Sequence, residues 1–152
     1  MTALETIRAW LPTFPQFAQL DDFSVDYAAA TPSSGGLMPG GLVEVSRSSD
    51  IVGNVTVTNQ YNFTLYFTFA KADGDDVGAT KNAEWLLSFQ NWVQAQSVAG
   101  LAPAFGDDPH SEKIQAQNGT LYGTDAEGTA LYSVQLSVQF VKKFKEDNPW
   151  LT

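Results

Sequence analysis

The stretch at residues 55–69, VTVTNQYNFTLYFTF, alternates apolar and polar side chains almost without interruption. Its odd positions are mostly apolar or aromatic, and its even positions are mostly Thr, Gln or Asn. A period of two is typical of a β-strand with one buried face and one solvated face. The β-branched and aromatic residues favour the same conformation. We therefore predict a long strand whose odd face lies on the core.

A second stretch of this kind lies near the C-terminus, at residues 130–144, ALYSVQLSVQFVKKF. Here the even positions are mostly apolar, and Ser or Gln occupies most positions between them. A strand over 112–122 should pair with it through the Gly-, Thr- and Asp-containing turn at 123–128. The two segments predict a C-terminal hairpin.

The strand over 55–69 should have its own partner at 42–52, joined to it through a turn at Gly53 and Asn54. The alternation in that partner is imperfect. A strict two-residue loop would turn Val43, Val45 and Ile51 away from the core. Because a slip of one residue moves every side chain to the other face, we expect a bulge or a longer loop in this hairpin.

Two segments show helical spacing instead. Residues 77–99 carry a broad apolar stripe that should pack against the odd face of 55–69. Residues 2–11 form a shorter amphipathic helix that opens with the capping-box pair Thr2 and Glu5. The stripe of the longer helix consists of Trp85, Leu86, Phe89, Trp92 and Val93.

Together these elements predict an α+β fold rather than a parallel doubly wound one. The sheet should be antiparallel and mostly four-stranded, built from the two hairpins, with a short strand at 23–27 ahead of them. A long central helix and a short N-terminal helix should cover one face. The length of 152 residues fits a single domain over 1–152.

The charge of the chain argues against several classes of partner. Its net charge is −9, with 17 acidic and 8 basic residues, so direct or sequence-specific nucleic-acid binding is not expected. There is no cysteine for a disulfide or a thiolate metal site. No stretch is apolar enough for a membrane span, and residues 1–5 do not resemble a signal peptide. We expect a protein made and used inside a cell.

The sequence offers no catalytic constellation. His110 is the only histidine, which excludes a two-histidine metal site, and its acidic neighbour Asp108 lies in the same loop. Residues 73–84 approach the spacing of a calcium loop, but Val77 stands where an oxygen ligand is needed, and helix capping explains the same acids. We therefore expect no catalytic residue, no cofactor and no metal, and a protein that is not an enzyme.

Candidate contact residues lie instead in loops, which commonly carry recognition. The Gly- and Pro-rich stretch 31–41, the loop 103–113 and the tail 145–152 are the segments that we expect to meet other proteins. The corresponding interface candidates are Leu37, Met38, Phe105, His110 and Trp150.

Several local patterns follow one another in a recognisable order: IRAWL at 7–11, VDY at 25–27, YNFTLYFTFA at 61–70, FQNWVQAQ at 89–96, LAP at 101–103, GTLYGTD at 119–125 and ALYSVQL at 130–136. Taken together, they resemble one known family, the minor capsid or tail-terminator-like proteins of siphophages and prophages of Gram-positive bacteria. The resemblance implies a structural virion protein, made in the host cytoplasm, that acts at the head–tail junction. It would form a hexameric ring and contact copies of itself, the tail-tube protein and a head-completion or connector protein. The Gly-rich stretch 34–41 departs most from the family pattern.

Two other classes of protein fit the same elements. One is a cone-shaped α+β domain similar to ketosteroid isomerases, which binds or converts a small molecule. It would need an acid or a Tyr–Asp pair inside an apolar cavity, and Tyr61 and Tyr132 are the only polar groups on the core-facing side of the long strands. The other is a subunit of a different tail-like assembly.

Overall fold

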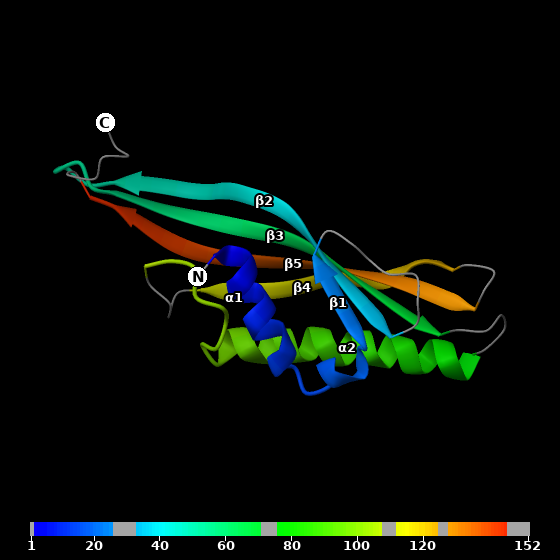
Figure 1. Cartoon of the computed structure of the whole chain (residues 1–152). Helices are drawn as coiled ribbons and strands as arrows, with labels where there is room; N and C mark the ends of the chain where they lie inside the picture. Colours follow the sequence, from blue (N-terminus) through cyan, green and yellow to red (C-terminus); the bar gives the residue numbers. More distant parts are fainter. Residues whose placement is uncertain (1, 26–32, 71–75, 108–111, 125–127, 146–152) are drawn as a thin grey trace.

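The computed structural model describes residues 2–25, 33–70, 76–107, 112–124 and 128–145 (Figure 1). Three short helices, one long helix and five strands follow each other along these segments. In chain order they are α1 (Ala3–Trp10), η1 (Leu11–Thr13), η2 (Phe17–Gln19), β1 (Asp22–Val25), β2 (Ser34–Ser49), β3 (Val55–Ala70), α2 (Asp76–Val98), β4 (Lys113–Thr124) and β5 (Thr129–Phe144).

The five strands form one sheet in the order β1-β2-β3-β5-β4. The two predicted hairpins are β2–β3 and β4–β5, and β3 joins them by pairing antiparallel with β5. The α+β class is confirmed. The expected sheet, mostly four-stranded and antiparallel, was incomplete, because β1 adds a fifth strand that runs parallel to β2.

The pairing of β3 with β5 runs over the full length of both strands. It extends from Val55 opposite Phe144 to Ala70 opposite Thr129 without a register shift. Odd residues of β3 therefore face the same side of the sheet as even residues of β5. Phe63, Leu65 and Phe67 on β3 are at most 4% exposed. The period-two pattern thus predicted both strands and their buried face correctly.

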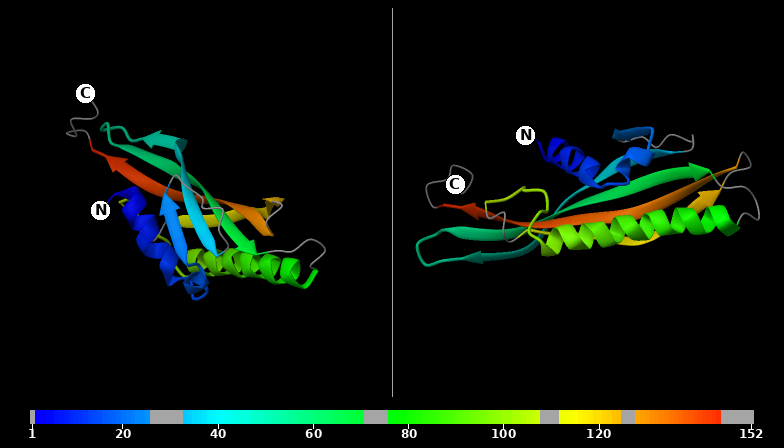
Figure 2. Two further views of the ribbon diagram at one scale, coloured as in Figure 1. Left: turned by 45° about the vertical axis from the view of Figure 1, so that its right-hand side comes forward. Right: turned by 90° about the horizontal axis from the view of Figure 1, so that it is seen from below.

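The helices pack on that face and complete the core. α2 runs along the sheet, as Figures 1 and 2 show. The Trp85 ring lies 4.8 Å from Phe67, so the predicted stripe meets the odd face of β3. α1 joins the same core through Trp10, whose ring stacks on Trp92 at 4.6 Å. The tryptophans of the helices are core residues, as their spacing indicated.

The start of α1 has the local geometry that the sequence predicts. The backbone N–H of Glu5 donates to the Thr2 hydroxyl at 3.2 Å, and the backbone N–H of Thr2 donates to the Glu5 carboxylate at 3.2 Å. This is a reciprocal capping box, which satisfies two otherwise unpaired donors at the helix start.

The glycine-rich stretch corrects a prediction. Residues 31–41 were expected to form a loop, yet β2 begins at Ser34 and its first four residues are buried. Gly35 lies against the ring of Phe23, and a Cβ there would meet that ring at 2.8 Å. The glycine allows β1 to approach β2 with an aromatic side chain between them, so its role is packing rather than chain flexibility.

Removing one ring from the core tests this packing. Phe89 is fully buried and contacts Phe14 and Phe67, so Phe89→Ala should lower the free energy of unfolding by about 3–5 kcal/mol. Leu87 lies two residues away on the same helix but is 59% exposed, and Leu87→Ala should change stability by no more than about 0.5 kcal/mol. Urea unfolding followed by tryptophan fluorescence measures both. Equal losses in the two variants would contradict this description of the core.

Candidate interaction surface

Three strands continue together beyond the helix layer. β2, β3 and β5 extend past the end of α2 as a narrow ribbon (Figure 1). We call residues 39–60 and 139–145 the arm. In β2, every residue from Pro39 to Ser49 is exposed, in contrast to the buried start of the same strand. The β2 strand of the arm therefore has little cover from the chain itself, whereas Val57 on β3 and Phe140 on β5 are buried.

Large apolar side chains are concentrated on the arm. Of the ten large hydrophobic residues that are exposed in the described part of the chain, five lie on the arm. Single exposed apolar residues are ordinary, but a group within one short segment is typical of a contact surface. The five are Leu42 (54% exposed), Val43 (49%), Val45 (49%), Ile51 (104%) and Val52 (57%).

Two bulges distribute these side chains over both faces of the ribbon. The register between β2 and β3 shifts between Pro39 and Gly41 and again between Glu44 and Ser46. Leu42 then lies opposite Tyr61, on the core side of the sheet, while Val43 lies opposite Gln60 on the other side. The expected irregularity in this hairpin is confirmed. A partner that covers all of these residues has to reach both faces of the arm.

The tip of the arm is held by one carboxylate. Asp50 Oδ1 accepts hydrogen bonds from the backbone N–H groups of Asn54 at 2.9 Å and Val52 at 3.0 Å. The Asn54 backbone hydrogen bond, supported by further bonds from the turn, lowers the pKa of Asp50 below its ordinary value of 3.8. Gly53 supplies the positive φ of 93° that the turn requires. Ile51 and Val52 are thus presented to solvent on an ordered turn.

The opposite edge of the sheet is closed by side chains. The outward N–H of Ile114 on β4 donates to Ser97 Oγ at 3.2 Å, and the amide of Gln90 donates to the Ala116 carbonyl at 3.1 Å. Farther along, the N–H of Asp107 donates to the Val141 carbonyl of β5 at 2.9 Å. On the β2 side, by contrast, no strand in the described segments pairs beyond residue 37. The sheet has one closed edge and one open edge.

Glu112 positions the loop that closes the β5 edge. Its side chain is only 3% exposed, and Oε1 accepts from the backbone N–H groups of Phe105 at 2.7 Å and Gly106 at 2.8 Å. Phe105 then packs against Tyr61 and Phe140, with ring centroids 5.2 and 5.8 Å away. Glu112 was not among the predicted residues, because its neighbours Ser111 and Lys113 are polar and indicate an exposed site. Its hydrogen bonds assign it a structural role.

The five interface candidates do not form one surface. Leu37 is fully buried and pairs with Leu65, so it is removed from the candidate surface. Met38 is half-buried at the point where β2 leaves the core, and Phe105 packs against the chain's own β3 and β5. His110 and Trp150 lie outside the described residues. The apolar residues of the arm were not among the candidates.

Ionisable side chains in the described segments do not gather into a metal site. No group of three His, Cys, Asp or Glu residues is close enough there to hold an ion. Glu84, part of the calcium-like spacing, is exposed on α2, and Asp73 and Asp75 lie outside the described residues. A search of the same segments for a helix long and apolar enough to cross a bilayer gives none.

Comparison with known proteins adds no family name to this geometry. No protein-family model matches the chain, and no curated protein matches it in sequence.

Acidification should loosen the tip of the arm. Because folding lowers the pKa of Asp50, its contribution is complete above the ordinary value of 3.8 and is lost as pH falls through the lowered value. In an NMR titration, the amide shifts of Val52 and Asn54 should change with a midpoint below 3.8. The same amides should show no such transition in Asp50→Ala. A midpoint above 3.8 would contradict the hydrogen-bonded turn.

The loop at 105–107 should depend on Glu112. Glu112→Ala leaves two backbone donors without their acceptor and should lower the free energy of unfolding by about 1–3 kcal/mol for each donor that stays buried. Glu112→Gln retains an acceptor oxygen and should lose less. Denaturant unfolding compares the two, with Glu84→Ala as a control at an exposed carboxylate. Equal stability of all three variants would exclude the anchoring role.

Proposed function

We propose that this chain is a structural virion protein of a tailed phage or prophage, a tail-terminator or minor capsid subunit at the head–tail junction. The observation that carries the proposal is the arm. A body with a well-filled aromatic core extends a ribbon whose β2 strand and tip carry exposed large apolar side chains on both faces. Such a ribbon gains stability only when another protein covers it, which favours a subunit of an assembly.

The segments that carry the family resemblance form the centre of this fold. YNFTLYFTFA lies in β3, FQNWVQAQ in α2 and ALYSVQL in β5. They supply the register and the core from which the arm extends. The resemblance therefore supports a shared scaffold, and the arm supports the use of that scaffold in assembly.

The charge pattern is compatible with a particle through which DNA passes. The net charge of −9 opposes phosphate binding. On the sheet face turned away from α2, the central rows carry uncharged amides and hydroxyls, such as Gln60 opposite Gln139 and Asn62 opposite Ser137. Like-charge repulsion from the rest of the chain would help DNA to slide past.

The proposed partners follow from this role. The subunit contacts copies of itself in a ring, the tail-tube protein on one side and a head-completion or connector protein on the other. It is made in the bacterial cytoplasm and ends in the virion. A ligand-binding domain of the ketosteroid-isomerase type has less support, because the core face of β3 is filled by rings from α2 such as Trp85 and Phe89.

Assembly of the purified protein tests this function. Size-exclusion chromatography with light scattering should give a discrete ring-sized oligomer rather than the 16.5 kDa monomer. The oligomer should co-sediment with tubes assembled from the tail-tube protein encoded in the same genome. Tubes assembled from an unrelated tail-tube protein serve as the control. A strict monomer that ignores its cognate tubes, or a genome without tail genes, would exclude the proposal.

A further inference from the structure

A cleft lies at the end of the body remote from the arm. It has a volume of about 510 Å³ and lies between α2 and the segment around η2. Its inner wall includes Phe69 and Trp85, whose rings are 5.1 Å apart and almost fully buried. Gln16, Gln19, Lys81 and Glu84 supply its polar rim. The cleft thus combines an apolar wall with a polar, charged border.

The tip of the arm and this cleft lie at opposite ends of one strand. β3 begins at Val55, beside the tip, and ends at Ala70, which lines the cleft. With a rise of about 3.3 Å per residue, the 16 residues of β3 separate them by roughly 50 Å. The tip of a chain therefore cannot reach its own cleft, and contact between the two requires a second copy.

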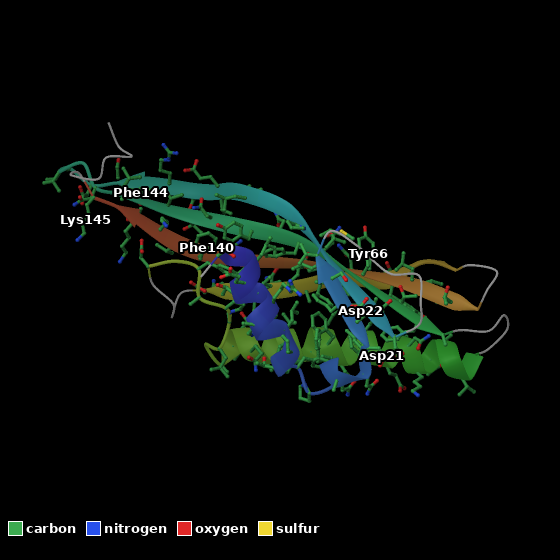
Figure 3. All side chains as sticks on the ribbon, viewed as in Figure 1. Asp21, Asp22, Tyr66, Phe140, Phe144 and Lys145 are labelled. Atoms are coloured by element: carbon green, nitrogen blue, oxygen red, sulfur yellow. The ribbon has the colours of Figure 1, made fainter. Side chains whose placement is uncertain are left out.

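The charges of the two ends are complementary. The arm contains four basic residues (Arg47, Lys142, Lys143 and Lys145) and two acidic ones (Glu44 and Asp50), a net charge of +2. The cleft lining contains one acid, Glu84, and one base, Lys81, so the negative charge at that end depends on Asp21 and Asp22. Figure 3 shows Lys145 on the arm, and Asp21 and Asp22 at the start of β1.

Glu84 lines the cleft, Asp21 is hydrogen-bonded to a lining residue, and Asp22 follows Asp21 in the chain. The backbone N–H of Asp21 donates at 2.6 Å to the carbonyl of Ser33, and Ser33 lines the cleft. The side chains of Asp21, Asp22 and Glu84 are all exposed. Opposite charges at the border of an apolar contact raise the association rate and select the correct partner.

We propose that the arm of one copy docks on a second copy, with Ile51 and Val52 in the cleft beside α2 and the arm lysines facing Asp21, Asp22 and Glu84. This inference rests on the proposed function and names the self-contact that the ring requires. The contact is heterologous, because it joins two different surfaces of the chain. Heterologous contacts close into rings when the rotation between neighbours allows it. A symmetric arm-to-arm contact would bring two positively charged ribbons together and leave the clefts empty.

Two variants with substitutions at exposed positions test the two sides of this contact, the arm and the cleft, one at a time. The arm variant carries Ile51→Glu and Val52→Glu, and the cleft variant carries Asp21→Lys, Asp22→Lys and Glu84→Lys. All five positions are exposed, so folding should be unaffected. Each variant alone should self-associate on the order of tenfold or more weakly than the unmodified chain. A matched control with Val98→Glu and Leu101→Glu, also exposed and apolar but outside the arm and cleft, should assemble normally.

Mixing the two variants gives the decisive result. The arm variant keeps an intact cleft and the cleft variant keeps an intact arm, so an equal mixture can form one contact and no more. Sedimentation velocity should show a heterodimer in the mixture, monomers of each variant alone, and the full oligomer for the unmodified chain. Increasing salt should weaken all of these complexes.

The outcomes distinguish this inference from the proposed function. If the unmodified chain and the arm variant form the same oligomer, or if the mixture gives no heterodimer, the arm-to-cleft contact is wrong while the assembly role stands. If the unmodified chain is a monomer that ignores its tail tubes, both are wrong.

Discussion

The uninterrupted pairing of β3 with β5 is the constraint on which the other elements depend. Both strands alternate apolar and polar side chains over most of their length, and their register brings the apolar sets to one side. A slip of one residue in either strand would expose Phe63, Phe67 and their neighbours, so only one pairing buries both. α2 can then place Trp85 and Phe89 on a continuous apolar face, and α1 adds Trp10 beside them. The β3–β5 pair and the helices packed on it therefore fix the position of the arm.

How far the sequence predicts this fold depends on the length of each pattern. β3, β5 and α2 are long and regular, and their bounds follow from periodicity within a few residues. The start of β2 does not follow from periodicity, because glycine at residues 35 and 36 usually marks a loop. The close approach of the Phe23 ring explains why a strand forms there. The parallel pairing of β1 with β2 was also missed. Residues 26–33, which join the two strands, are fewer than the dozen or more that a parallel crossover usually takes.

The candidate surface was harder to predict than the fold. Loops at 31–41 and 103–113 were reasonable choices by composition, yet Leu37 is core and Phe105 packs against its own sheet. One signal was present. The segment 42–52 has apolar residues on the wrong parity for a buried strand, and the bulges turn this mismatch into exposed side chains on both faces. Glu112 left no such signal, because a buried carboxylate that holds two backbone donors looks like any other acidic residue in a sequence.

The bulges of β2 and the side chains that close the β4 edge also affect how the free chain aggregates. In a concentrated solution of protein, a long flat strand edge recruits other strands into cross-β aggregates. Ser97 and Gln90 occupy the outward groups of one edge, while Pro39 and two register shifts distort the other. Backbone-to-backbone growth is thereby discouraged in both directions. Any contact that the sheet makes with another chain is therefore expected to depend on side chains rather than on backbone pairing.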